Sequence, residues 1–206
     1  MKKTLFLSAA AAVLALAGTS CSSENDQPMP GNGNNVSFRV SLPEELQSRA
    51  LGDGLQALEL SYAVYASDDA NHEVLRSGSA TFQNLHTTVN FSLPKGKKYD
   101  IIFWAQNPDA PYTFSAENRN VTIDYEAGYT EENDAFSYVL KNFAITTATS
   151  QTVTLKRPFA QLNIGTTDYD MADMLGLKVT QTAVTVKDVY TQFNFMDGEQ
   201  GDVAKD

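Results

Sequence analysis

The chain has 206 residues, of which 42% are hydrophobic and 10% aromatic, enough to bury the core of one large domain or two small ones. Its formal net charge is −10, and the basic clusters that nucleic-acid binding requires are missing, so nucleic acid is excluded as a partner. The single cysteine excludes an internal disulfide framework.

Residues 1–20 have the organisation of a secretory signal peptide. A basic start precedes an apolar run over residues 4–17, which is too short to span a bilayer as a helix. Small residues up to Ser20, followed at once by Cys21, resemble a bacterial lipobox, although Gly18 stands where the usual Leu would be. We therefore predict cleavage between Ser20 and Cys21 and lipidation of Cys21. The alternative is an ordinary signal peptide followed by an incidental cysteine.

The segment after the cysteine, residues 21–34, has few apolar side chains and many turn formers, so we expect a disordered tether. Its acidic residues Glu24 and Asp26 resemble the surface-export signal of lipoproteins from the Bacteroidales. A tether without sorting information is the alternative. Residues 35–206 are then the folded part.

The folded part has the pattern of a β-protein. Val36, Phe38, Val40 and Leu42 alternate with polar residues, which is the period of a half-buried strand. Similar short segments separated by turn formers predict strands over residues 36–42, 58–66, 73–76, 79–82, 87–93, 98–104, 121–125, 153–155, 162–164, 177–186 and 189–195. Many short strands of this kind indicate an all-β sandwich or barrel. We expect one two-layer sandwich.

The core is expected to contain the inward-facing residues of these strands, namely Phe38, Leu60, Tyr62, Val64, Phe91, Ile101, Phe103, Leu155, Leu162 and Ile164. The nearly continuous apolar run over residues 99–104 predicts a strand covered on both faces. Trp104 belongs to that run, which favours a core position over a glycan-binding platform.

Helix is scarce in the pattern. Asp168 is suited to cap a short helix over residues 169–175, with Gly176 just after its end. One or two helical turns are also expected over residues 135–140.

Candidate chemistry is sparse, and we predict no enzyme, no cofactor and no metal. His72 and His86 lack the spacing of a zinc site, and no phosphate loop, dinucleotide fingerprint or serine-nucleophile motif occurs. Two acidic clusters have ligands that calcium accepts, but turns and solvated loops use the same residues: Asp68, Asp69, Asn71 and Glu73, and Glu131, Glu132, Asn133 and Asp134.

Several short tracts are similar to fimbrillin-like lipoproteins of the Bacteroidales, in order and spacing: residues 61–65, 103–106, 134–136, 156–167 and 189–194. The resemblance implies a type V pilus subunit with a transthyretin-like, Greek-key β-sandwich and one or two short helices. Such proteins travel as lipoproteins, are trimmed by an arginine-specific protease and polymerise by strand exchange as stalk, anchor or tip subunits. The family's second domain would begin near residue 201, so we expect it to be absent or truncated here.

The function expected from this resemblance is that of a surface lipoprotein of the outer membrane, acting as a structural or adhesive fimbrial subunit. Its partners would be other fimbrial subunits, the outer membrane through the lipid anchor, and a host or bacterial surface ligand. The alternative is a surface lipoprotein that binds a glycan or host ligand without polymerising.

Arg49 is the best candidate for the maturation cut. It follows Pro43 and precedes two glycines, so an exposed loop is expected, where proteases cut. Cleavage between Arg49 and Ala50 would release the strand over residues 36–42. The alternative is a basic loop residue with no such role.

Overall fold

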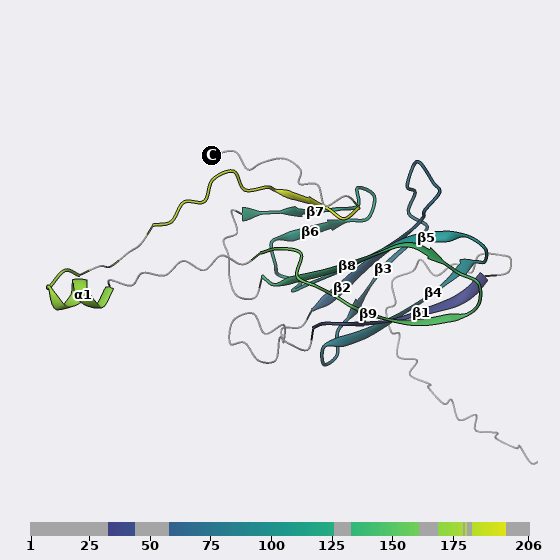
Figure 1. Ribbon diagram of the computed structural model, residues 1–206, viewed down its shortest axis with the longest axis horizontal. Helices are drawn as coiled ribbons and strands as arrows, with labels where there is room; N and C mark the ends of the chain where they lie inside the picture. Colours follow the sequence, from purple (N-terminus) through teal and green to yellow (C-terminus); the bar gives the residue numbers. More distant parts are fainter. Residues whose placement is uncertain are drawn as a thin grey trace, which may run out of the picture.

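The computed structural model describes residues 33–43, 58–125, 133–160, 169–178, 180 and 183–196, and they form an all-β sandwich (Figure 1). Within these residues the strands, in chain order, are β1 (Gly33–Ser41), β2 (Glu59–Ala66), β3 (Arg76–Thr81), β4 (His86–Pro94), β5 (Lys98–Gln106), β6 (Tyr112–Ser115), β7 (Asn120–Ile123), β8 (Ala135–Ala144), β9 (Thr149–Thr154) and β10 (Gln192–Asn194). The helix α1 spans Tyr169–Met174.

The strands are arranged in three sheets. Sheet A has the order β4-β1-β9, sheet B the order β3-β2-β5-β8, and sheet C the order β10-β7-β6. Sheets B and C are antiparallel throughout. In sheet A, β1 runs antiparallel to β4 and parallel to β9.

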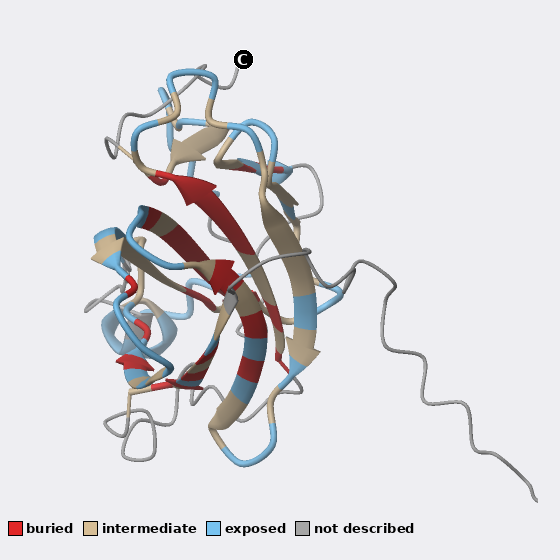
Figure 2. Ribbon diagram, turned by 90° about the vertical axis from the view of Figure 1, so that its right-hand side faces the viewer, coloured by how far each residue is buried: buried red, intermediate tan, exposed pale blue. Residues whose placement is uncertain are grey.

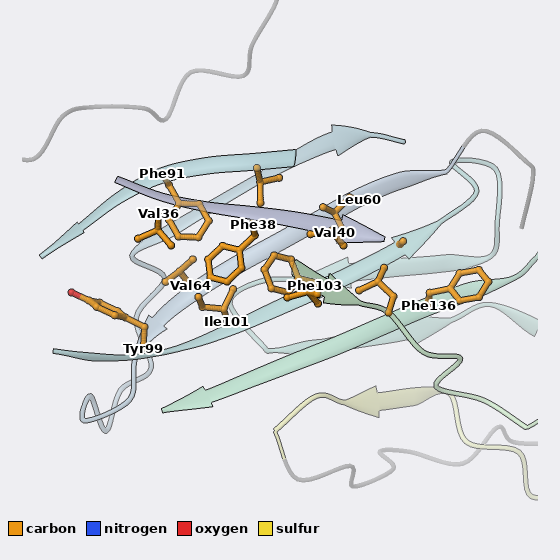
Figure 3. Close-up of a cluster of buried hydrophobic side chains, with 14 of the residues drawn as sticks. Val36, Phe38, Val40, Leu60, Val64, Phe91, Tyr99, Ile101, Phe103 and Phe136 are labelled. Carbon is orange, nitrogen blue, oxygen red and sulfur yellow. The ribbon is translucent and has the colours of Figure 1, made fainter. Parts of the chain in front are cut away.

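The larger hydrophobic core lies between sheets A and B (Figure 3). Phe38 of β1 is at its centre, with ring centroids 5.7 Å from Phe91, 5.4 Å from Phe103 and 5.5 Å from Phe143. Tyr62 stacks on Phe91 at 5.5 Å and is only partly buried. Aromatic rings from both sheets therefore converge on one residue of the first strand.

A second core lies between the other face of sheet B and sheet C. Trp104 of β5 is fully buried there, and its ring meets those of Tyr112, Phe159 and Phe195 edge-on at 5.6, 6.1 and 5.6 Å. The strand that contains residues 99–104 is thus covered on both faces, as predicted. The expected two-layer sandwich gains a third, smaller layer. Figure 2 shows that buried residues follow the strands and that turns are exposed.

The predicted core is largely confirmed. Seven of its members are buried: Phe38, Leu60, Val64, Phe91, Ile101, Phe103 and Leu155. Leu162 and Ile164 lie outside the described residues. The predicted helix near residue 169 is also confirmed, and Gly176 ends it with φ +75° while its N–H donates to the carbonyl of Asp173.

Three expectations about secondary structure were wrong. Residues 135–140 form no helix but the first part of β8, because pairing with β5 satisfies their backbone and buries Phe136. The strand expected over residues 177–186 is not found among the described residues of that range, where Leu177 and Val184 are exposed. The separate strands at 73–76 and 79–82 are one strand, β3.

The position of Phe38 leads to a prediction about stability. Phe38→Ala is expected to lower the free energy of unfolding by about 3–5 kcal/mol, because it leaves a cavity among the three surrounding rings. Arg39→Ala, at the next and exposed position of β1, should change it by less than about 0.5 kcal/mol. Urea unfolding of the chain measures both. Equal losses for the two variants would contradict the central place of Phe38.

The buried hydroxyl of Tyr65 predicts a loss of stability in alkali. Burial raises the pKa of Tyr65 well above its ordinary value of 10.0, and its hydroxyl donates to the carbonyl of Ala116 at 2.6 Å. Above about pH 10 the unfolded chain loses this proton while the folded chain keeps it, so stability falls as pH rises.

Urea unfolding between pH 9 and 11 tests this alkaline loss. Tyr65→Phe should be less stable at pH 8 by about 1 kcal/mol and should show a shallower fall. Tyr190→Phe, whose ring is 41% exposed, should keep the fall of the unaltered chain. An unchanged slope in Tyr65→Phe would refute the assignment.

Candidate functional site

The feature with the clearest functional implication is β1, the central strand of sheet A. It pairs with β4 along its whole length, from Gly33 opposite Pro94 to Ser41 opposite His86. On its other side it pairs with β9 from residue 36 to residue 41. Both of its edges are therefore occupied, and β1 holds the other two strands of the sheet together.

The apolar side chains of β1 and of the residue after it fill the core below sheet A. Val36, Phe38, Val40 and Leu42 are 1%, 0%, 0% and 3% exposed. Each fully buried side chain of this size contributes roughly 1.5–3 kcal/mol, so the four together contribute about 6–12 kcal/mol before the entropy cost. The alternation in the sequence produces this arrangement, because successive side chains of a strand point to opposite faces.

β1 also comes first among the strands that the structure describes. Residues 44–57 join it to β2, so one peptide break within that segment separates β1 covalently from every later strand. Arg49 and Ala50, the predicted cleavage pair, are in that segment but lie outside the described residues.

Removing β1 would open a groove between β4 and β9. Backbone groups of both strands would lose their partners, and the floor of the groove would be the apolar face of sheet B, including Leu60 and Phe103. Two open strand edges above an apolar floor bind an extended chain with alternating apolar residues. With β1 absent, the exposed edges and apolar floor would suit an extended strand of the same alternation.

Sequence reasoning found β1 but missed β9 as its second partner. Adjacent antiparallel strands are indicated by a turn between them, whereas β1 and β9 are parallel and more than a hundred residues apart, as in the pairing of Val36 with Thr149. No local sequence pattern indicates a parallel strand so distant in the chain.

The other arginines are held within the fold. Arg39 is on β1, and Arg76 begins β3. Arg119 lies in the turn between β6 and β7 with φ 53°. Arg157 forms an ion pair with Asp134 at 2.7 Å and lies over the ring of Phe136 at 5.5 Å. Ordered backbone of this kind is a poor protease substrate.

The lipidation and signal-cleavage residues, Ser20 and Cys21, lie outside the described residues, and so do Glu131 and Glu132. The predicted extents of the signal peptide, tether and folded domain stay predictions. Among the described residues no helix is long and apolar enough to cross a membrane.

The acidic cluster after β2 is organised as a turn. The Asp69 carboxylate accepts hydrogen bonds from the backbone N–H groups of Asn71 at 3.0 Å and Glu73 at 2.8 Å. These bonds lower the pKa of Asp69, and the bond from Glu73 has the larger effect. His72 adopts φ 53° within this turn. Within the described ranges no three His, Cys, Asp or Glu residues are grouped to hold a metal ion.

Trp104 is buried and does not form part of an exposed aromatic platform. Its Nε1–H donates to the side-chain oxygen of Gln106 at 2.6 Å inside the second core. Tyr125 and Tyr190 are 46% and 41% exposed, and the Tyr125 hydroxyl donates to the carbonyl of Tyr190 at 2.9 Å. Trp104 is thus unable to stack on a sugar ring.

Three solved structures show partial similarity to this chain. A candidate polysaccharide-binding protein (DUF1812) from Bacteroides thetaiotaomicron is 16% identical with a TM-score of 0.40, over 60% of this chain and 47% of that chain. The C-terminally truncated tip fimbrial protein Mfa3 from Porphyromonas gingivalis is 12% identical with a TM-score of 0.40, over 61% and 48%. The T6SS lipoprotein TssJ1 from Pseudomonas aeruginosa is 10% identical with a TM-score of 0.34, over 60% and 90%.

The similarity to the first two structures spans about half of their length. No curated protein matches the sequence. A model of a family of unknown function, DUF6562, matches residues 28–206, and the chain therefore belongs to this family.

Proposed function

We propose that this protein is a surface lipoprotein of the outer membrane that serves as a fimbrial subunit, and that it accepts a strand from another subunit after β1 is released. The observation that carries the proposal is the position of β1. It is the first of the described strands, it is paired on both edges, and it supplies the centre of the larger core.

The release of β1 would remove a large part of the free energy that stabilises the fold. A domain is stable by only roughly 5–15 kcal/mol, and the buried apolar side chains of β1 and Leu42 contribute about 6–12 kcal/mol before entropy. A body that lacks β1 would therefore expose a groove that needs an occupant. A strand from another subunit with the same alternation restores both the backbone pairing and the core.

The site of release follows from the chain's arginines. Arg49 lies between β1 and β2, so a cut there divides the chain between the removable strand and the body. The same cut separates the body from Cys21 and its proposed lipid. An uncleaved copy would stay attached to the membrane and anchor a filament, and a cleaved copy would be free to enter one.

The proposal assigns no catalytic role, cofactor or metal to the chain, and its partners are other subunits and the lipid bilayer. The adhesive alternative, glycan binding without polymerisation, receives less support because Trp104 is 0% exposed. A ligand on a host or bacterial surface remains compatible with a subunit role.

Cleavage at Arg49 is the first test. A trace of arginine-specific protease should produce one dominant new N-terminus at Ala50, because the four arginines among the described residues lie within or beside paired strands. Arg49→Gln should remove this product, and Arg119→Gln should leave it unchanged. N-terminal sequencing and intact mass identify the product.

The same digestion has an outcome that contradicts the proposal. Cleavage elsewhere while Arg49 stays intact would exclude it as the maturation site. A cut chain in which β1 does not exchange with an added strand would leave the cleavage without a role in assembly.

Lipidation is tested separately in cells. Cys21→Ala should leave the membrane fraction and lose incorporation of labelled fatty acid, because the several acyl chains of a bacterial lipoprotein hold it firmly whereas a single chain binds only marginally. Ser22→Ala is the matched control and should remain attached. Labelling that persists in Cys21→Ala would rule out the predicted lipobox.

A further inference from the structure

A turn with three lysines lies beside the point where the tether enters the fold. The β4–β5 turn carries Lys95, Lys97 and Lys98, all exposed, and we call it the lysine turn. Gly33, the first residue of β1, pairs with Pro94, which is next to Lys95 in the sequence. In Figure 1 the start of β1 (purple) and the lysine turn lie at the end of the sandwich opposite to α1.

Backbone hydrogen bonds hold the lysine turn in place. The N–H of Gly96 donates to the carbonyl of Ile145 at 3.0 Å, and the N–H of Ile145 donates to the carbonyl of Lys97 at 3.4 Å. Gly96 has φ +74°, which a glycine adopts without strain. The three ammonium groups are therefore presented from a fixed backbone and not from a loose loop.

We propose that the lysine turn is a contact surface for the anionic headgroups of the membrane to which the protein is tethered, and that it orients the anchored protein. The proposal rests on the lipid anchor at Cys21 proposed above. It adds a site on the folded body and an orientation, which the anchor alone does not specify.

The length of the tether brings the lysine turn to the membrane. About twelve residues separate Cys21 from Gly33. If they form the tether that their composition predicts, its end-to-end distance is about 17–21 Å. The strand β5, with 9 residues, extends about 30 Å along the sandwich. The lysine turn is thus at the near end of the body, and Gln106 is at the far end.

Charge favours contact at the lysine turn over contact elsewhere. The chain as a whole carries −10 and is repelled by an anionic surface, whereas the lysine turn has three cations in four residues. Each cation near such a surface strengthens contact about fivefold. This attraction acts only within about 8–10 Å at physiological salt.

Acidic residues beside the lysine turn give the contact a direction. The N–H of Ser67 donates to the carbonyl of Lys98 at 3.0 Å, so the turn that carries Asp68 and Asp69 is an immediate neighbour. Its carboxylates are repelled by the headgroups that attract the lysines. We expect the sandwich to tilt so that the lysine turn faces the bilayer and the Asp68 turn faces away.

The first test uses the lipidated protein on vesicles of phosphatidylcholine with and without phosphatidylglycerol. An amine-acylating reagent and mass spectrometry measure the reaction rate of each lysine, with the exposed Lys178, four residues after the end of α1, as the reference. The lysine turn should react at least about fivefold more slowly on the anionic vesicles, and high salt should abolish the difference. Equal rates on both vesicles would overturn the proposal.

A second test does not need the anchor. Cys21→Ala protein should cosediment weakly with the anionic vesicles, and the triple variant K95Q/K97Q/K98Q should lose this binding. The triple variant K156Q/K178Q/K187Q changes the net charge equally and should retain it. Equal losses in both triple variants would show a general charge effect and refute the lysine turn. Failure of the lipidated protein to float with either vesicle would instead count against the anchor, so the two proposals fail separately.

Discussion

The pairing of β1 with both β4 and β9 is the interaction on which the sandwich depends. Within the described residues, β4 and β9 each pair with β1 and not with each other, so β1 alone connects them in sheet A. Phe38 of the same strand meets aromatic rings from both sheets. Backbone pairing and core packing therefore both rely on one strand, which precedes the other described strands in the sequence. The proposed cut at Arg49 would separate it from them without breaking a later strand.

Sheet B also contributes to a second core that does not involve β1. Its second face is covered by sheet C, where Trp104 packs against Tyr112 and Phe195. The core between sheets B and C contains no side chain of β1. A body without β1 would keep this second core and lose part of the first. The proposed strand exchange depends on this difference.

Much of the fold was predictable because its causes are local. The alternation in residues 36–42 indicated β1, and the apolar run at residues 99–104 indicated a strand covered on both faces. The small sheet C was harder, because β6 and β10 have only 4 and 3 residues, too few for a clear period. Residues 135–140 form a strand because β5 supplies their backbone partners, and tertiary pairing of this kind overrides local propensity.

The candidate site was predictable only in part. The alternation of residues 36–42 indicates β1, whereas the exposed loop expected around Arg49 stays a prediction outside the described residues. The place that β1 occupies in sheet A also depends on β9, a parallel neighbour with no sequence signal. The lysine turn is visible in the sequence as three charges. The position of these lysines beside the start of β1 depends on the register that pairs Gly33 with Pro94. Only the structure supplies that register.

The most direct test of the account is strand replacement in the cleaved protein. Chain cut after Arg49 is mixed with a fluorescent peptide of residues 33–43, and a control peptide carries Thr at positions 36, 38 and 40. Fluorescence anisotropy measures uptake, and hydrogen exchange measures protection of β4 and β9. The account predicts uptake of one peptide of the natural sequence per chain, with protection of both strands, and no uptake of the control. Equal uptake of the two peptides, or full protection of β4 and β9 in a body from which β1 has been removed, would contradict it.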